Sequence, residues 1–415
     1  MIIFDVIVAG AGPAGATAAK VLGEAGVSTL FLDKSAFPRD KPCGGGISAR
    51  ALARFPYLSA ALRNIPSSWV NKVHFESPSG FVVDYQSPDR LYLMIRRSEF
   101  DNLLFSLALP QVEVATGLAR KVTVHVDHVS VITDNDEYRA RMIIGSDGAN
   151  SIIARASGLR VGSVQSEYAI DMMEETPRQE LSTAEGDRMY IYYRIRSHYG
   201  YGYVFPKTSH LNVGVGFKLD YYLSNLRGEH YAHHQAFVDD LKSKQLLSGQ
   251  SNRANFRAFP LPISGPLART YADRVLLAGD AGGFVNALTA EGIYYAMVTG
   301  DLAARAAIDA IREGNFASSQ LSGYQRAWKR EIGDELATSV RLQKLLLGDP
   351  TRVDRIVRAA SRHAALADLL ARFATGAITY GQFRRSMLRR ALPVYLMEKT
   401  RRLFLTGSRA FGYPG

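Results

Sequence analysis

The chain has 415 residues, of which 47% are hydrophobic and 21% charged, a balance typical of a globular protein with one to three cores. Its one cysteine, Cys43, excludes an intramolecular disulfide and a four-cysteine zinc site, so we expect a reducing, cytoplasmic compartment. The net charge is +11, and no run reaches the roughly 18 to 20 apolar residues that a membrane-spanning helix needs.

The N-terminal part of the chain alternates between strand and helix patterns. Residues 2–9 and 28–32 have the β-rich, apolar composition of buried strands, and residues 16–25 form an alanine-rich helical segment between them. This pattern predicts a βαβ unit. Residues 35–48 contain two prolines and three consecutive glycines, which indicates a long functional loop.

The turn after the first strand reads Gly10-Ala11-Gly12-Pro13-Ala14-Gly15, which fits the fingerprint of a dinucleotide-binding turn. Glycines permit the tight turn and let a pyrophosphate reach backbone N–H groups at the start of the following helix. Asp33 ends the second strand, where a carboxylate can accept hydrogen bonds from ribose hydroxyls. A glycine turn that holds no ligand is the alternative. The predicted dinucleotide-binding residues here are Gly10, Gly12, Pro13, Ala14, Gly15, Asp33 and the adjacent Lys34.

The middle of the chain is rich in strand patterns. Residues 67–94 predict short alternating strands, residues 96–109 a helix, and residues 112–132 further strands with valines near period two. Residues 140–146 predict a buried strand that ends at Asp147. Six tyrosines follow between residues 188 and 203, so we expect an antiparallel sheet with one aromatic face.

The first pattern returns in the last third of the chain. Residues 275–278 predict a strand, residues 279–283 a glycine-rich turn, and residues 292–312 a helix. The chain after residue 327 has a helical period.

Two motifs resemble those of flavoprotein hydroxylases in order and spacing: residues 145–151, which include Asp147, and Gly279-Asp280-Ala281 ahead of Glu291-Gly292. In that family the aspartate at the position of Asp280 holds the ribityl chain of FAD. The helix that starts at Gly292 and Ile293 offers its N-terminal amides to the flavin pyrimidine edge, and an arginine, here Arg97, lies near the diphosphate. The resemblance implies FAD as the cofactor. A surface arginine and a simple turn aspartate are the alternatives for Arg97 and Asp147.

The fold class that follows is α/β, α+β overall, with a Rossmann-like FAD domain interrupted by an antiparallel β-sheet substrate domain and followed by a helical C-terminal region. We expect the FAD domain to be discontinuous in sequence. The predicted boundaries are 1–66, 96–165 and 268–326 for the FAD domain, 67–95 and 166–267 for the substrate domain, and 327–415 for the helical region.

Among flavoproteins, the chain resembles the geranylgeranyl reductases of archaeal lipid and photosynthetic pigment metabolism. Three stretches carry the resemblance: Lys41-Pro42-Cys43-Gly44-Gly45-Gly46, Tyr201-Gly202-Tyr203-Val204-Phe205-Pro206, and Gly279-Asp280-Ala281-Gly282-Gly283-Phe284-Val285-Asn286. The resemblance implies that Cys43, Gly44 and Gly45 lie near the isoalloxazine ring. Tyr203 stands where members usually carry tryptophan, and Ala287 and Ala290 stand where proline and glycine are common, so the substrate wall differs.

An isolated alkene is a poor hydride acceptor, so hydride transfer must be matched by a proton in a dry site. Tyr201, Tyr203 and Phe205 alternate along a predicted strand, share one face and can press an isoprene unit against the flavin. A plain sheet core is the alternative, and a small buried hydrophobe is the alternative role for the cysteine. The predicted substrate contacts are Tyr201, Tyr203, Phe205 and Pro206, and the predicted catalytic residues are Cys43, Tyr201 and Tyr203.

The sequence therefore predicts an FAD-dependent reductase that saturates the C=C bonds of a prenyl chain. A second glycine fingerprint is missing, which suits NADPH that binds briefly or a ferredoxin-like donor as reductant. An FAD-dependent monooxygenase and a prenyl-lipid-binding escort without redox activity are the alternatives. We expect no metal site, because the adjacent His233 and His234 point in different directions and have no cysteine nearby.

Residues 381–415 contain eight Lys or Arg and one acid, Glu398. Apolar residues alternate with these cations, which is typical of amphipathic segments on anionic membranes and argues against nucleic acid as a partner. We expect a cytoplasmic protein that binds prenyl lipid and associates peripherally with the inner face of the cell membrane. A helix that packs on the core and carries solvated arginines is the alternative.

Overall fold

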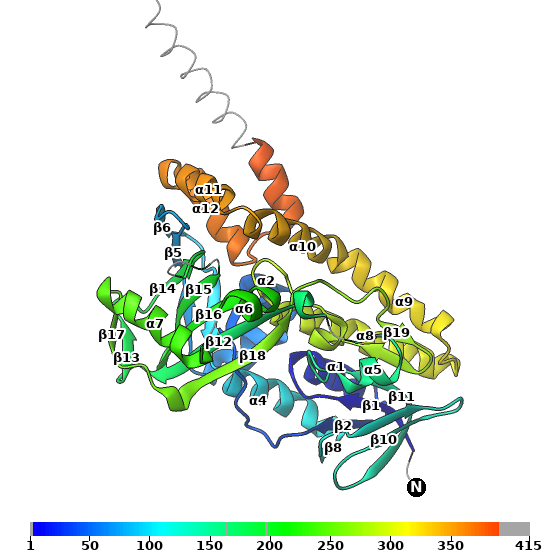
Figure 1. Cartoon of the computed structure of the whole chain (residues 1–415). Coiled ribbons are helices and arrows are strands. Elements are labelled where there is room, and N and C mark those ends of the chain that lie inside the picture. Colours follow the sequence, from blue (N-terminus) through cyan, green and yellow to red (C-terminus); the bar gives the residue numbers. More distant parts are fainter. Residues whose placement is uncertain (1–2, 163, 196–197, 199, 227, 390–415) are drawn as a thin grey trace, which may run out of the picture.

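The computed structural model describes residues 3–162, 164–195, 198, 200–226 and 228–389. Two large sheets lie at opposite sides of this part of the chain, with helices between and beside them (Figure 1). The mixed α/β architecture confirms the predicted fold class.

The first sheet contains the predicted βαβ unit. Its central strands pair in parallel, and α1 (Pro13–Glu24) connects the first two along the chain. A short antiparallel strand, β19 (Tyr271–Ala272), lies at the edge. The parallel strands are β20 (Val275–Leu277), β11 (Glu137–Gly145), β1 (Ile3–Ala9), β2 (Thr29–Asp33) and β8 (Glu113–Thr116).

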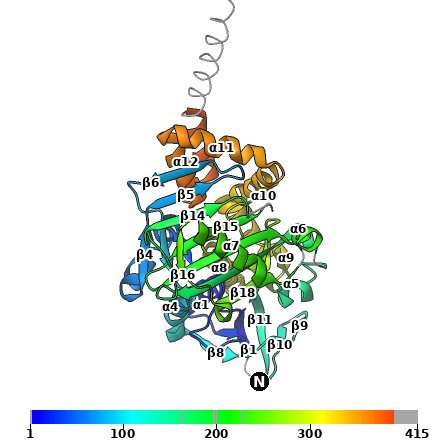
Figure 2. The ribbon, with the colours of Figure 1, turned by 60° about the vertical axis from the view of Figure 1, so that its left-hand side comes forward.

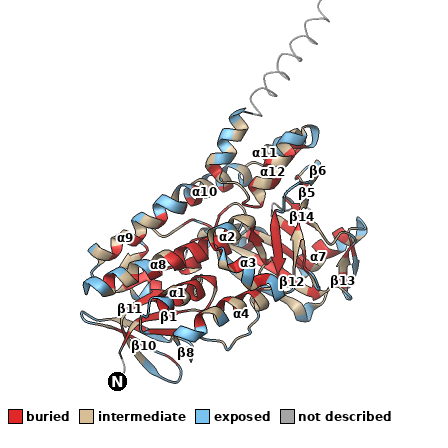
Figure 3. Ribbon diagram, turned by 180° about the vertical axis from the view of Figure 1, so that it is seen from behind, coloured by how far each residue is buried: buried red, intermediate tan, exposed pale blue. Residues whose placement is uncertain are grey.

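This first sheet is buried on both faces, because alternate residues of its strands point to opposite sides. Val6 and Val8 face α1, α4 (Arg97–Ala108) and α8 (Ile293–Glu313), whereas Ile7 and Ala9 face a second core cluster. The second cluster contains residues of β9 (Lys121–Val124), β10 (Val129–Ile132) and α5 (Ile152–Ala156). Figure 3 shows α1, α8 and the sheet as the buried centre of this half.

The second sheet has seven strands in the order β18-β12-β16-β15-β14-β5-β6. It departs from the predicted antiparallel pattern at one place, because β14 pairs with β5 in parallel. The hairpin of β5 and β6 comes from an early excursion of the chain and joins the sheet at its edge. The strands are β5 (Lys72–Glu76), β6 (Val82–Gln86), β12 (Tyr168–Pro177), β14 (Arg188–Tyr192), β15 (Tyr201–Pro206), β16 (His210–Lys218) and β18 (Phe256–Pro262).

Smaller elements lie beside this sheet or pack on the core of the first sheet. Helices α6 (Leu219–Asn225) and α7 (His230–Ser243) pack against it. The other predicted strands of residues 67–95 form a separate three-stranded sheet with a strand from the functional loop. The remaining elements are β3 (Gly46–Ser48), β4 (Ser67–Val70), β7 (Tyr92–Ile95), β13 (Leu181–Thr183), β17 (Leu247–Gly249), α2 (Ala49–Arg54) and α3 (Tyr57–Ala61).

The chain after residue 327 is helical up to the last described residues, as predicted. Helix α9 (Ser318–Trp328) continues through a π-helical turn into α10 (Asp334–Leu347). Helices α11 (Pro350–Arg362) and α12 (Ala364–Ala374) then lie over β5 and β6 (Figure 2). None of the helices in the described ranges has the length and apolar character that crossing a bilayer requires. Most of the basic segment 381–415 lies outside the described residues.

Candidate active site

The predicted dinucleotide turn joins β1 to α1. Gly10 has a φ of +101°, and a Cβ there would lie 2.3 Å from the carbonyl oxygen of Ser146. A Cβ on Gly15 would lie 1.8 Å from the carbonyl oxygen of Gly10, so both positions need glycine. A Cβ on Gly12 would meet nothing closer than 3.9 Å, and Gly12 caps α1 without a side-chain hydrogen bond. This open space and the uncapped N–H groups behind Pro13 fit a phosphate.

Asp33 ends β2, as predicted, and both of its oxygens bind the backbone near the turn. Oδ2 accepts a hydrogen bond from the N–H of Ala11 at 2.6 Å, and Oδ1 accepts one from the N–H of Ser35 at 2.9 Å. The guanidinium of Arg39 approaches Oδ1 to 3.9 Å, while Lys34 is exposed. Because each carboxylate oxygen can accept two hydrogen bonds, Asp33 retains capacity for a ribose hydroxyl.

Arg97 is buried at the start of α4. Its Nε and Nη2 atoms donate to the two oxygens of Asp101 at 2.7 and 2.9 Å, and Arg39 approaches the same carboxylate to 3.3 Å. Asp101 is fully buried. Two guanidinium groups on one carboxylate leave a surplus positive charge, which suits an anionic diphosphate.

Asp280 lies in the turn between β20 and α8, and the charges of three cations act on its carboxylate. Burial raises the pKa of Asp280, while the charges of Lys41, Arg97 and Arg160 act in the opposite direction. Lys41 belongs to the loop 35–48, and its local sequence did not predict a role for it in the site. The cluster carries more positive than negative charge, which again suits an anionic group.

The start of α8 lies next to Asp280. Gly292 caps the helix without a side-chain hydrogen bond, and Ile293 is its first residue. A Cβ on Gly292 would lie 3.6 Å from Asp280 Oδ1, and one on Gly279 would lie 3.0 Å from the Cβ of Ala14 in α1. Two uncapped helix N-termini, each with a partial positive charge, therefore flank the Asp280 turn.

Asp147 follows β11, as predicted, and part of its carboxylate is used to cap α5. Oδ2 accepts a hydrogen bond from the N–H of Ile152 at 2.7 Å. Oδ1 is buried and has no hydrogen-bond partner in the described part of the chain. Burial raises the pKa of Asp147. A buried oxygen of this kind fits a hydrogen-bond donor on a bound group.

The loop that contains Cys43, Gly44 and Gly45 lies against the second sheet. Cys43 Sγ accepts a hydrogen bond from the N–H of Gly45 at 3.4 Å, and the carbonyl oxygen of Cys43 accepts one from Lys207 at 3.5 Å. A Cβ on Gly44 would lie 2.7 Å from the ring of Phe205. Gly45 has a φ of +71°, which favours glycine. The loop and the aromatic strand are therefore in contact.

Tyr201, Tyr203 and Phe205 stand in a row on one face of β15, which confirms the predicted alternation. The ring centroids of Tyr201 and Tyr203 are 5.8 Å apart, and those of Tyr203 and Phe205 are 4.7 Å apart. Both tyrosines line a cavity of about 490 Å³. Phe205 and Pro206 do not line it, because Phe205 packs on Gly44 and Pro206 is buried in the sheet.

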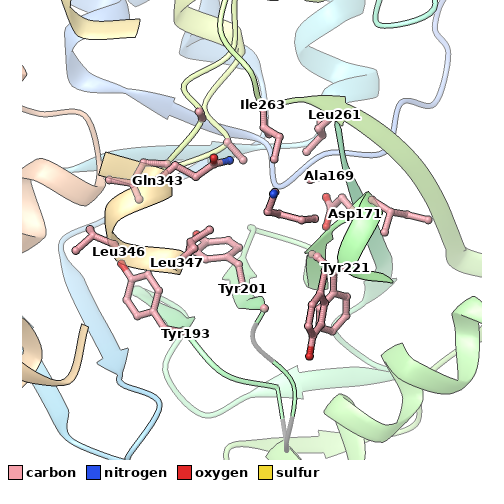
Figure 4. A pocket seen from close by; sticks show the side chains of 18 of the residues that line it. Ala169, Asp171, Tyr193, Tyr201, Tyr221, Leu261, Ile263, Gln343, Leu346 and Leu347 are labelled. Atoms are coloured by element: carbon pink, nitrogen blue, oxygen red, sulfur yellow. The ribbon is translucent and has the colours of Figure 1, made fainter. Parts of the chain in front are cut away.

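The cavity lies between the second sheet and the C-terminal helices. Figure 4 shows Tyr193, which directly follows β14, and Tyr201 of β15 beside Leu346 and Leu347 of α10. Most of the side chains around the space are apolar. The helical wall was not predicted, because nothing in the local sequence of α10 specifies which distant strand it covers.

One side of the cavity reaches the segment before α8. Ala287, Leu288 and Ala290 line it there, directly before Gly292. Ala290 has a φ of +57°, a conformation that favours glycine and that an L-residue adopts at some cost in free energy. The cavity thus reaches Ala290, two residues before the Gly292 cap of α8.

Asp171 is a site residue that the sequence analysis missed. It lies on β12, lines the cavity, and its Oδ2 accepts a hydrogen bond from the hydroxyl of Tyr203 at 3.0 Å. Burial raises the pKa of Asp171 to about 7, and the hydrogen bond from Tyr203 opposes the shift. The available signal was an aspartate between Ile170 and Met172 in the middle of an apolar strand.

Similarity to known proteins extends over most of the chain. The model of the FAD binding domain family matches residues 4–313. Digeranylgeranylglycerophospholipid reductase 1 of Methanopyrus kandleri is 30% identical over 370 residues, which cover 83% of this chain and 90% of the relative.

Two solved structures share the fold. A geranylgeranyl bacteriochlorophyll reductase-like protein from Thermoplasma acidophilum has a TM-score of 0.76 at 20% identity, over 93% of this chain and 99% of that chain. A probable FAD-dependent monooxygenase from Pseudomonas aeruginosa has a TM-score of 0.63 at 17% identity, over 85% of this chain and 99% of that chain. At identities this low, the two comparisons show a shared fold and carry no conclusion about function.

Proposed function

Because the chain belongs to the FAD binding domain family, as an FAD-dependent oxidoreductase related to digeranylgeranylglycerophospholipid reductases, we propose that it saturates C=C bonds of a prenyl chain. The observation that carries this proposal is the apolar cavity between the start of α8 and α10, with Tyr201 and Tyr203 along one wall. A prenyl chain is long, flexible and apolar, and a cavity of this character suits it.

The residues around the Asp280 turn fit FAD. The space beside Gly12 and the cations near Asp280 would hold the diphosphate, and the uncapped start of α8 would face the flavin. When bound in its reduced form, FAD supplies a hydride. The free hydrogen-bonding capacity of Asp33 and Asp147 and the surplus positive charge at Arg97 support cofactor-binding roles for these residues. We add Lys41 to the proposed cofactor-binding residues, because its charge acts on Asp280.

The chain itself would bind and orient the substrate and exclude water. The flat rings of Tyr201 and Tyr203 can hold an isoprene unit in one orientation. Burial raises the pKa of both tyrosines, so their hydroxyl groups stay neutral. At about 0.8 kcal/mol per buried CH₂, a few isoprene units supply ample binding free energy before ordering costs. Cys43 does not line the cavity, but we retain it as a proposed residue near the flavin because its loop contacts the aromatic strand.

We further propose NADPH or a ferredoxin-like protein as the reductant and an anionic membrane surface as the source of the lipid. The excess of cations in residues 381–415 supports association with an anionic membrane. Binding of the purified chain to vesicles with and without anionic lipid measures this association directly.

The first prediction concerns the reaction. Purified protein, reduced anaerobically with dithionite and mixed with a digeranylgeranyl phospholipid, should reoxidise its flavin while the product mass rises in steps of two hydrogens. Absorbance of the flavin and mass spectrometry of the extracted lipid check this outcome. Lipid that keeps its mass while the flavin stays reduced contradicts the proposal.

A monooxygenase is the second candidate, because a probable FAD-dependent monooxygenase shares the fold. It predicts an oxygen-dependent gain of one oxygen atom in the lipid. A prenyl-lipid escort predicts a protein that extracts lipid but retains no flavin. The same purified preparation, assayed with and without oxygen, separates the three activities.

A further inference from the structure

A buried carboxyl group on the cavity wall has no role in the function proposed so far. Asp171 is 7% exposed and lies in the middle of β12, between Gly216 of β16 and Phe259 of β18. Its Oδ2 accepts the hydrogen bond from Tyr203, while Oδ1 is buried and has no hydrogen-bond partner within the described ranges. Ionised carboxylates are seldom buried in this way, because an unpartnered charged oxygen loses its hydration without compensation.

Burial among mostly uncharged groups favours the neutral acid of Asp171, while hydrogen bonds from Tyr203 and from the backbone of Met172 act in the opposite direction. Tyr203 and Tyr201 face it from β15, and neither carries a charge at neutral pH. Among the residues that the structure describes, Lys41 of the loop 35–48 is the cation whose charge acts on Asp171, and its ammonium lies 5.0 Å from the ring of Phe259. Lys218 and Asp220 line the same cavity but bind each other at 3.3 Å. Because Oδ2 accepts from Tyr203, the proton of the neutral acid belongs on Oδ1.

Resting on the proposed function, we infer that Asp171 is the acid that protonates the substrate alkene, with Tyr203 holding its carboxyl group in place. One alkene carbon takes up the hydride of reduced FAD as the π bond breaks. The neighbouring carbon forms a C–H bond with the proton of Asp171, whose O–H bond breaks. The positive charge of Lys41 stabilises the carboxylate that remains, and solvent reprotonates it before the next cycle.

Infrared difference spectroscopy on the oxidised, substrate-free protein tests whether Asp171 holds the proton. We expect a protonated carboxyl band that disappears near pH 7 in the wild type and is absent from Asp171→Asn. In Tyr203→Phe the band should persist to higher pH, because the lost hydrogen bond favoured the ionised form. Glu174→Gln is the matched control, since Glu174 is a fully buried carboxyl group on the same strand. It does not line the cavity, and it accepts hydrogen bonds from the hydroxyl of Ser251 and the N–H of Asn252. A band that Asp171→Asn leaves unchanged overturns the inference.

Single-turnover rates of prereduced protein with a digeranylgeranyl phospholipid test the proton transfer itself. Asp171→Asn should slow saturation by about 10²- to 10⁴-fold without changing lipid affinity, and Glu174→Gln should leave the rate unchanged. The wild-type rate should fall as the pH rises and Asp171 loses its proton. In Tyr203→Phe, which keeps Asp171, this fall should occur at a higher pH. The Tyr203→Phe variant therefore still tests the inference if Asp171→Asn fails to fold. Asp171→Asn with the wild-type rate and pH profile overturns this inference alone. A wild type that leaves the lipid unsaturated overturns the proposed function and this inference with it.

Discussion

Glu291 lies directly before α8, where a buried carboxyl group meets two other charged side chains. Arg50 approaches it to 3.8 Å and binds Glu335 more closely, at 2.7 Å. Burial raises the pKa of Glu291 to about 7, with the charge of Arg50 acting in the opposite direction. The folded protein therefore binds a proton here at a pH at which the unfolded chain, with a pKa near 4.5, has released it.

This arrangement gives the stability of the protein a pH dependence with a defined sign. Between pH 4.5 and about 7 the folded state binds more protons at Glu291, so the free energy of unfolding falls as pH rises, by at most about 1.4 kcal/mol per pH unit. Glu291→Gln should remove this part of the dependence. The variant should gain stability relative to the wild type from pH 5 to pH 8, measured by urea unfolding. A difference in the free energy of unfolding between Glu291→Gln and the wild type that stays constant from pH 5 to pH 8 contradicts the prediction.

At the scale of elements, the close packing of α1 against α8 positions the cofactor residues. A Cβ on Gly300 of α8 would lie 2.1 Å from the carbonyl oxygen of Ala14 in α1. This close approach brings the two uncapped helix N-termini together, with the Asp280 turn between them. The dinucleotide turn therefore depends on a glycine almost 300 residues away in the sequence.

Gly300→Ala should push α1 away from α8, because backbone atoms of Ala14 cannot yield as a flexible side chain would. We expect a loss of about 1 to 3 kcal/mol in the free energy of unfolding, together with weaker retention of FAD. Urea unfolding and the flavin content of the purified protein measure the two effects. Gly323→Ala is the control, because Gly323 lies within α9 and the nearest described atom to its Cβ would be the end of the Arg326 side chain at 3.7 Å. The control should be neutral or slightly stabilising.

At the scale of the whole molecule, the C-terminal helices complete a cavity that the second sheet leaves open. Asp354 of α11 fastens this covering to the turn between β5 and β6. Its Oδ1 accepts from the hydroxyl of Ser77 at 2.8 Å and from the N–H of Ser79 at 2.9 Å, and its Oδ2 accepts from the hydroxyl of Ser79 at 2.8 Å. The neighbouring Val353 lines the cavity.

Asp354→Ala should loosen α11 from the sheet, because three hydrogen bonds to one carboxylate are lost together. We expect a loss of about 1 to 3 kcal/mol in stability and faster proteolytic cleavage between α10 and α12. Asp309→Ala provides the comparison, since Asp309 forms a 3.6 Å ion pair with Arg312 on an exposed part of α8. Equal proteolysis of the two variants would show that the contacts of Asp354 do not hold the covering.

The local patterns of the sequence determined the strands and helices of the first sheet, the dinucleotide turn and the row of rings on β15. These features depend on residues close together in the chain: a glycine that must adopt a positive φ, a carboxylate at a strand end, or side chains that alternate along a strand. Sequence patterns also indicated the FAD family, because its motifs occur in a characteristic order.

Only the tertiary structure decided which side chains meet. It placed Lys41 where its charge acts on Asp280, and it joined Asp171 to Tyr203 by a hydrogen bond. It also left Phe205 and Pro206 outside the cavity and used one oxygen of Asp147 to cap α5. The domain boundaries stay a prediction, although β4 and β7 pair with β3 in a sheet of their own. Burial and proximity arise when distant segments pack, so the sequence pattern along any one segment carries little information about them.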